Sequence, residues 1–194
     1  MSKVIETIKI SIILFLITAI SAALLAFVNQ KTSPMIEQNE QKKISDALKL
    51  VMSDAADFEK SELPDTADKI TENYGTDIIE FYIAKGSDGN DVGICAIAET
   101  KGYSSGLRCA VGVNKNGEVT GVEIISHNET PGLGANAEKE EFRSQYAGKK
   151  DELSVVKNNA SANEINAISG ATLTSRGVTS NVNTVIALLH EINE

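Results

Sequence analysis

An uncharged apolar segment from Ile10 to Val28 constrains the fold more than any other feature of this sequence. Its nineteen residues, ISIILFLITAISAALLAFV, contain neither proline nor glycine. At about 1.5 Å per residue, a helix of this length measures roughly 28 Å, close to the hydrocarbon thickness of a bilayer. The segment therefore predicts a single N-terminal transmembrane helix. The alternative is a signal peptide cleaved near residues 21–23 or 25–26, although the apolar regions of signal peptides usually span only about 7–15 residues.

The charged residues give the two parts of the chain opposite net charges, but they do not predict which end of the apolar segment faces the cytoplasm. Lysines lie on both sides of it, so the positive-inside rule gives no answer. Residues 1–31 carry a charge of +2, and because the whole chain carries -9, residues 32–194 carry -11. The sequence also has no stripe of Lys and Arg interleaved with aromatic residues. We therefore expect an acidic domain that stands off an anionic lipid surface and binds no nucleic acid.

The few cysteines and histidines exclude several classes of site. Two of each leave no disulfide scaffold, no Cys-built zinc site and no His-rich metal centre, so we predict no metal site. Cys95 and Cys109 are symmetric about Gly102, so a hairpin centred there would bring them close enough for a disulfide. Two small buried thiols on separate strands are the more ordinary interpretation.

Hydrophobic periodicity and turn residues predict an α+β fold, in which helices flank an antiparallel sheet. A helix is expected over residues 34–60, with Pro34 in its first turn. Strands are expected over 78–84, 92–98, 107–113 and 118–125, and Asn116-Gly117 is a specific hairpin signal. A short amphipathic helix over 137–146 should present Phe142 and Tyr146 on one face, and a further strand is expected over 153–156. The last helix should span 172–192 and bury a stripe of five apolar residues: Val178, Val182, Val185, Ile186 and Leu189.

Two loop segments have the composition of ligand-binding loops. In residues 168–178, ISGATLTSRGV, small residues precede the last helix, where free N–H groups favour an anion and Arg176 could pair with a phosphate. Taken alone, this segment is more typical of a Ser/Thr-rich helix cap. In residues 127–134, HNETPGLG, one proline and two glycines suit a tight turn with exposed N–H groups. His127 and Glu129 could form an acid/base or ring-contacting pair there, or both could simply be solvated.

Together, these two segments resemble the FMN-binding domain of the RnfG family, found in the Rnf-type ion-translocating ferredoxin:NAD oxidoreductases. They are also similar to the related FMN-binding subunit of the sodium-translocating NADH:quinone oxidoreductase. The resemblance includes the N-terminal anchor, the helix after it, the Gly102-Tyr103 region and the Asn-Gly hairpin. In that family FMN is joined through its phosphate to the last Thr of a Ser/Thr-Gly-Ala-Thr motif by a separate flavin transferase. The resemblance therefore implies covalent attachment at Thr172, although Asn166 stands where the motif commonly has Asp.

The same resemblance implies the rest of the cofactor site. The loop at 127–134 should line the pocket of the flavin ring, and the residues around Thr172 should surround the phosphate. The implied cofactor-binding residues, besides Thr172, are Ser169, Gly170, Ala171, Thr174, Ser175, His127, Glu129, Thr130, Gly132, Leu133 and Gly134. No catalytic residue is expected, because the cofactor would supply the redox chemistry.

The implied function is electron transfer within a membrane-bound ion-translocating complex. The chain would be a redox subunit of a translocase and not a complete enzyme, with other membrane and redox subunits, a flavin transferase and the lipid bilayer as partners. We expect a cytoplasmic stub at 1–9, a transmembrane helix at 10–30, a helical connector at 31–75 and an extracytoplasmic FMN-binding domain at 76–194. The alternatives are a stand-alone anchored flavoprotein that serves an extracellular acceptor, and a non-redox anchored binding module.

Overall fold

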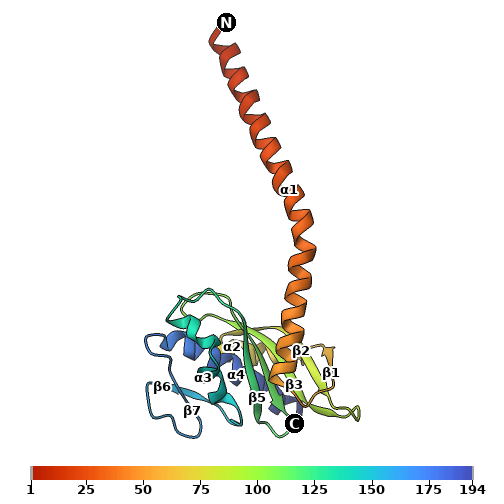
Figure 1. Ribbon diagram of the computed structural model, residues 1–194, viewed down its shortest axis with the longest axis vertical. Coiled ribbons are helices and arrows are strands. Elements are labelled where there is room, and N and C mark those ends of the chain that lie inside the picture. Colours follow the sequence, from red (N-terminus) through yellow and green to blue (C-terminus); the bar gives the residue numbers. More distant parts are fainter. Residues whose placement is uncertain (1, 194) are drawn as a thin grey trace. The chain divides into compact units, whose positions relative to one another are not determined.

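The computed structural model describes residues 2–193, with side chains from residue 5 onward, and divides into two compact units, Met1–Lys42 and Lys43–Glu194. The first unit is formed by helix α1 (Ser2–Val51), whose last turns belong to the second unit (Figure 1). The large apolar side chains of the first unit are exposed, for example Phe15 at 69% and Leu25 at 72%. Within the described residues, α1 is the one helix long and apolar enough to cross a membrane.

The helix predicted over residues 34–60 was wrong at both boundaries. It is continuous with the apolar segment, so Pro34 lies inside α1 and offers no N–H to the preceding turn. The helix ends at Val51, and residues Asp57–Ser61 form a strand, β1, instead of a last helical turn. A second helix, α2 (Ala67–Tyr74), follows β1 and ends at Gly75, whose φ of 62° is the left-handed conformation typical after a helix.

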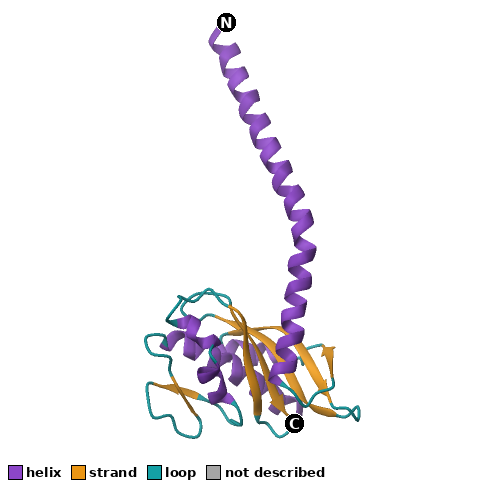
Figure 2. Ribbon diagram, viewed as in Figure 1, coloured by secondary structure: helices purple, strands orange, loops and turns teal. Residues whose placement is uncertain are grey.

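The sheet of the second unit is an antiparallel meander of five strands in the order β1-β2-β3-β4-β5 (Figure 2). The four strands predicted from the sequence are confirmed, each within about two residues at either end. They are β2 (Thr76–Lys85), β3 (Asp91–Thr100), β4 (Leu107–Asn114) and β5 (Val119–Ser126). The predicted Asn-Gly turn joins β4 to β5, with the Gly117 N–H donating to the Asn114 carbonyl oxygen at 2.9 Å.

Both faces of this sheet are buried, because a different helix covers each. On one face, side chains such as Ile94 and Ala96 belong to the same cluster as the apolar stripe of α4 (Thr172–Asn193). On the other face, Cys95 and Ile97 pack with the end of α1 and Met52. Burial on both sides explains why β3 is apolar at nearly every position instead of at alternate ones.

The end of α1 packs against a pair of glycines on the last two strands of the sheet. Gly112 and Gly121 are directly opposite each other on β4 and β5. A Cβ at Gly112 would lie 2.6 Å from the Val51 carbonyl oxygen, and one at Gly121 would lie 2.9 Å from Val51 Cα. The Thr120 hydroxyl also donates to that carbonyl oxygen. Only glycine at these two positions allows the helix end to approach the sheet this closely.

The two cysteines lie on opposite faces of the sheet and are both free. In the β3–β4 pair, Cys95 is opposite Gly112 and Cys109 is opposite Ala98. The hairpin is therefore not centred on Gly102, and the opposed arrangement that would have suited a disulfide does not occur. Burial raises the pKa of both thiols to about 12.

The C-terminal half differs in detail from the sequence prediction. The helix expected over 137–146 is broken into η1 (Gly134–Glu138), α3 (Glu140–Arg143) and η2 (Ser144–Tyr146). Phe142 and Tyr146 are nevertheless buried, with their rings edge to face at 5.6 Å. The expected strand β6 (Ser154–Val156) pairs in parallel with β7 (Glu164–Asn166), which the sequence did not reveal. Helix α4 and its buried stripe are as predicted.

Candidate functional site

The loop after β5 is a tight turn built on Pro131-Gly132. The Leu133 N–H donates to the Thr130 carbonyl oxygen at 3.1 Å, and Gly132 has a φ of 79°. A positive φ at the third residue is what a type II turn requires, and it explains the Pro-Gly sequence. The turn leads directly into η1 and brings Thr130, Leu133 and Gly134 toward the start of α4.

The loop before α4 is a turn of the same kind. The Ala171 N–H donates to the Ile168 carbonyl oxygen at 2.9 Å, and Gly170, in the third position, has a φ of 75°. The Ser175 hydroxyl fastens this turn from inside, because it accepts the Ile168 N–H at 2.9 Å and donates to the Ala171 carbonyl oxygen at 3.0 Å.

The first turn of α4 has no side-chain cap, contrary to the ordinary interpretation of its Ser/Thr-rich sequence. The residue before the helix is Ala171, whose methyl group accepts no hydrogen bond. In the described residues, no side-chain oxygen is hydrogen-bonded to the backbone N–H of Thr172, Leu173 or Thr174, although side-chain oxygens do pair with backbone N–H groups elsewhere in the chain. These N–H groups have no intrahelical acceptor, and together with the helix dipole they favour an anion at this point.

The two turns face each other across a pocket of about 500 Å³. This volume falls within the range of about 300–1,000 Å³ that is usual for small-molecule sites. The residues that line it are Tyr103, Glu129, Thr130, Leu133, Gly134, Gly170, Ala171, Thr172, Leu173 and Thr174. Eight of these ten were predicted site residues, so the fold joins two segments that lie almost forty residues apart.

The four hydroxyl groups of the SGATLTS segment have different surroundings. Thr174 and Ser175 are buried, and their hydroxyls are hydrogen-bonded within the protein. Ser169 is exposed and lines a different pocket. Thr172 is half-buried and lines the large pocket, and its hydroxyl makes no hydrogen bond to any described residue. Of these four residues, Thr172 is therefore the one that lines the large pocket and whose hydroxyl makes no hydrogen bond to a described residue.

Glu129 connects the three segments that form the pocket. Its side chain is buried, and its carboxylate accepts the Thr174 hydroxyl at 2.7 Å and the Ser104 N–H at 3.0 Å. A Cβ at Gly102 or at Gly134 would overlap a carboxylate oxygen of Glu129, so both glycines are needed for this approach. The carboxylate thus fixes the loop around Tyr103, the turn after β5 and the start of α4 to one another.

Several predicted site residues lie outside the pocket lining. His127 is beside Glu138, with 3.1 Å between Nε2 and Oε1 but without hydrogen-bond alignment, and its Nδ1 accepts the Glu129 N–H at 3.1 Å. Its role in the structure is thus to shape the loop. Gly132 forms the turn, Ser175 fastens the helix start, and Arg176 is exposed one turn further along α4.

Tyr103 and Leu173 line the pocket but were not among the predicted site residues. Their signal in the sequence was weak. Leu173 is a single apolar residue inside a run of small and hydroxyl residues, and Tyr103 lies in a short loop between strands. The structure identifies both residues more clearly, because each is a large apolar or aromatic side chain that lines the pocket and is exposed, Tyr103 at 68% and Leu173 at 52%.

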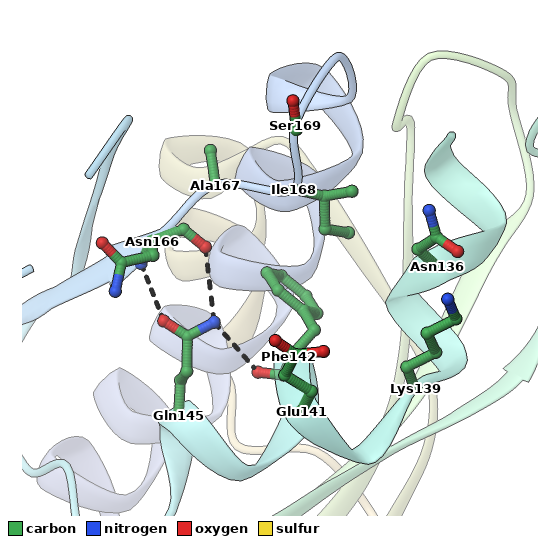
Figure 3. Close-up of a pocket in the computed structure, with 9 residues that line it drawn as sticks. All are labelled: Asn136, Lys139, Glu141, Phe142, Gln145, Asn166, Ala167, Ile168 and Ser169. Carbon is green, nitrogen blue, oxygen red and sulfur yellow. Dashed lines mark hydrogen bonds between the residues drawn. The ribbon is translucent and has the colours of Figure 1, made fainter. Parts of the chain in front are cut away.

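A second, smaller pocket of about 270 Å³ is lined by residues 166–169 and by residues of η1, α3 and η2. Figure 3 shows the Gln145 side-chain amide hydrogen-bonded to the Asn166 backbone N–H and carbonyl oxygen and to the Phe142 carbonyl oxygen. The Asn166 side-chain oxygen accepts the Ala160 N–H at 3.0 Å. A carboxylate oxygen could accept the same bond, so the Asn found here supplies the acceptor that an Asp would provide.

The described residues contain no group of three or more His, Cys, Asp or Glu side chains that could hold a metal ion. An organic anion fits the larger pocket better than a metal does. The pocket offers free N–H groups at a helix start, a free hydroxyl at Thr172, and apolar side chains at its mouth. These features suit an organic phosphate with an apolar part.

Two family models match parts of this chain. Residues 102–187 match the FMN-binding domain family, and residues 1–51 match the RnfG N-terminal region. All ten pocket residues fall within 102–187.

The chain is also similar over nearly its whole length to RnfG-type subunits of ion-translocating complexes. It is 38% identical over 195 residues to the RnfG-type subunit of the Na(+)-translocating ferredoxin:NAD(+) oxidoreductase complex of Acetobacterium woodii, covering 96% of this chain and 93% of that protein. It is 36% identical over 164 residues to the corresponding protein of the proton-translocating complex of Clostridium ljungdahlii, covering 84% and 80%. The crystal structure of Shewanella oneidensis NqrC has the same fold, with a TM-score of 0.53 at 21% identity over 73% of this chain and 72% of that one. The chain therefore belongs to the RnfG family, whose members are subunits of ion-translocating oxidoreductase complexes, and residues 102–187 of it match the FMN-binding domain.

Proposed function

We propose that this chain carries electrons on an FMN attached through a phosphoester to Thr172, as the RnfG subunit of a membrane-bound ion-translocating ferredoxin:NAD oxidoreductase. The observation that carries the attachment site is the free hydroxyl of Thr172, which lines the large pocket while the neighbouring hydroxyls are hydrogen-bonded or lie outside it. The relatives in Acetobacterium woodii and Clostridium ljungdahlii are subunits of complexes of this name.

The residues around Thr172 suit a phosphoester. A phosphate bound to one threonine oxygen keeps about one negative charge, and the free N–H groups at the start of α4 stabilise it. Because residues 32–194 carry -11, the overall charge of the domain opposes the phosphate, and local dipoles must hold it. When bound, FMN supplies reversible electron transfer, and the protein supplies the pocket.

The experiment is co-expression of the full chain with a flavin transferase, followed by flavin fluorescence of the band on a denaturing gel. We expect a fluorescent band from the wild type and from Thr172→Ser, and none from Thr172→Ala. Ser169→Ala is the matched control, because it removes a hydroxyl three residues away that lines a different pocket. A fluorescent band that survives Thr172→Ala would disprove attachment at this residue.

We further propose that residues 10–30 span the membrane and that the FMN-binding domain lies on the extracytoplasmic side. The exposed apolar surface of α1 supports a lipid environment. Other membrane and redox subunits would then be the partners that supply and receive electrons. Gentle solubilisation tests this part of the proposal, because we expect multi-span subunits to co-purify with the chain. Isolation of the chain by itself would favour a stand-alone flavoprotein.

A further inference from the structure

Glu129 is the one charged side chain among the described residues that line the large pocket. It is only 6% exposed, and no Lys, Arg or His in the described part of the chain forms an ion pair with it. Its carboxylate oxygens are held by two neutral donors, the Thr174 hydroxyl at 2.7 Å and the Ser104 N–H at 3.0 Å. The pocket wall therefore contains a negative charge that no positive side chain neutralises.

This charge is also fixed in position. The two donors come from different segments, the loop after β3 and the first turn of α4, and each holds one carboxylate oxygen. The backbone at Gly102 and Gly134 packs against the same oxygens so closely that neither position has space for a Cβ. The carboxylate thus has no room to turn away from the pocket when the charge inside the pocket changes.

We propose that Glu129 sets the midpoint potential of the flavin by opposing the build-up of negative charge in this pocket. The inference rests on the function proposed above. Complete reduction of FMN adds two electrons and takes up one or two protons from solvent, so the bound group becomes more negative when only one proton is taken up. A fixed carboxylate that is itself only 6% exposed disfavours that change, because Coulomb repulsion from a buried charge is screened less than it is in water. Glu129 should therefore keep the potential low.

The test is Glu129→Gln in the full flavin-loaded chain, with the midpoint potential measured by absorbance during reductive titration with dithionite, which is oxidised to sulfite. Glutamine has the same shape, its oxygen can accept the Ser104 N–H and its NH₂ can donate to Thr174, so chiefly the charge is lost. We expect a higher potential than in the wild type. Glu138→Gln is the matched control, since Glu138 is 60% exposed and does not line the pocket, and its potential should equal that of the wild type.

A potential of Glu129→Gln equal to or below that of the wild type would overturn the proposal. Glu129→Asp keeps the charge and should remain closer to the wild type than Glu129→Gln does. If Glu129→Gln does not fold, Leu173→Lys places a positive charge at an exposed residue of the same pocket, and an unchanged potential there would also overturn the proposal. Absence of flavin from the wild-type chain contradicts the proposed function itself, whereas a loaded wild type with an unresponsive Glu129→Gln contradicts only the role of Glu129.

Discussion

Individual buried residues of α4 show how a polar helix packs on an apolar sheet. Thr179 donates its hydroxyl to the Ser175 carbonyl oxygen at 2.9 Å, so the buried Tyr146 hydroxyl must be the donor in their 2.9 Å contact. Asn183 both accepts from the Leu153 N–H and donates to its carbonyl oxygen, each at 2.9 Å. Because nearly every buried polar group of the helix is satisfied in this way, its Ser, Thr and Asn content is compatible with complete burial.

The buried thiols lead to a prediction about reactivity and pH. Because burial raises the pKa of Cys95 and Cys109 to about 12, we expect neither to react with a thiol reagent at pH 8 before unfolding, and both to react afterwards. In the unfolded chain these thiols lose their protons near pH 9.0, so between pH 9.0 and about 12 the unfolded state binds fewer protons than the folded one. The free energy of unfolding should therefore fall with rising pH in this window, by roughly 1.4 kcal/mol per pH unit for each thiol.

Thiol titration and chemical denaturation at several pH values would check this prediction. The control is the double variant Cys95→Ala/Cys109→Ala. In this variant the decrease in the free energy of unfolding that the two thiols cause at alkaline pH should disappear. Rapid labelling of the folded wild type at pH 8 would contradict it.

At the scale of elements, the two faces of the sheet are buried by different helices. The end of α1 covers one face, and the whole of α4 covers the other. The last turns of α1 contribute Ile44, Ala47, Leu48 and Val51 to the cluster beneath β3 and β4. This contact needs Gly112 and Gly121 side by side, because a side chain on either strand would separate the helix end from the sheet.

We predict that Gly112→Ala and Gly121→Ala each lower the free energy of unfolding by about 1–3 kcal/mol. The added methyl group would meet the backbone of Val51, which cannot move aside as a flexible side chain could. Denaturant unfolding of the full chain in detergent, followed by circular dichroism, measures the change. Glu59→Ala, on the exposed face of the edge strand β1, is the control and should change stability by less than about 0.5 kcal/mol. Two alanine variants as stable as this control would show that the glycine pair is not required.

At the scale of the whole molecule, the N-terminal part with the apolar segment and the rest of the chain have net charges of opposite sign. Residues 1–31 carry +2 and residues 32–194 carry -11. The acidic part is repelled by anionic lipid, so the pocket should remain accessible to solvent and to partner subunits instead of lying against the bilayer.

If the FMN-binding domain lies on the extracytoplasmic side, as proposed, a cysteine on its surface should be accessible to reagents from outside the cell. Ser105 is exposed, and both native thiols are buried, so Ser105→Cys introduces the one reactive thiol expected in the described residues. In intact cells we expect a membrane-impermeant maleimide to label this variant and to leave the wild type unlabelled. Labelling of Ser105→Cys that requires permeabilised cells would place the domain in the cytoplasm.

The sequence by itself determined the features that depend on neighbouring residues. The uncharged run at 10–28, the alternation of strands and turns from 78 to 125, and the periodic stripe of α4 are all local patterns, and the structure reproduces the strands and helices they predict. Pro-Gly and Ser-Gly likewise mark the two turns of the site, because only glycine adopts their positive φ without strain. Local patterns marked the turns, and eight of the ten pocket residues were among those implied by the resemblance to the FMN-binding family.

Only the tertiary structure decided what depends on residues far apart in the sequence. Strands β1 and β7 form because partners elsewhere in the chain complete their hydrogen bonds, and neither has a clear apolar pattern of its own. The free hydroxyl of Thr172, the buried carboxylate of Glu129 and the position of His127 outside the pocket lining likewise depend on which segments meet around them. Local sequence encodes the shape of each turn, whereas the packing of the turns against α4 determines which of their side chains face the pocket.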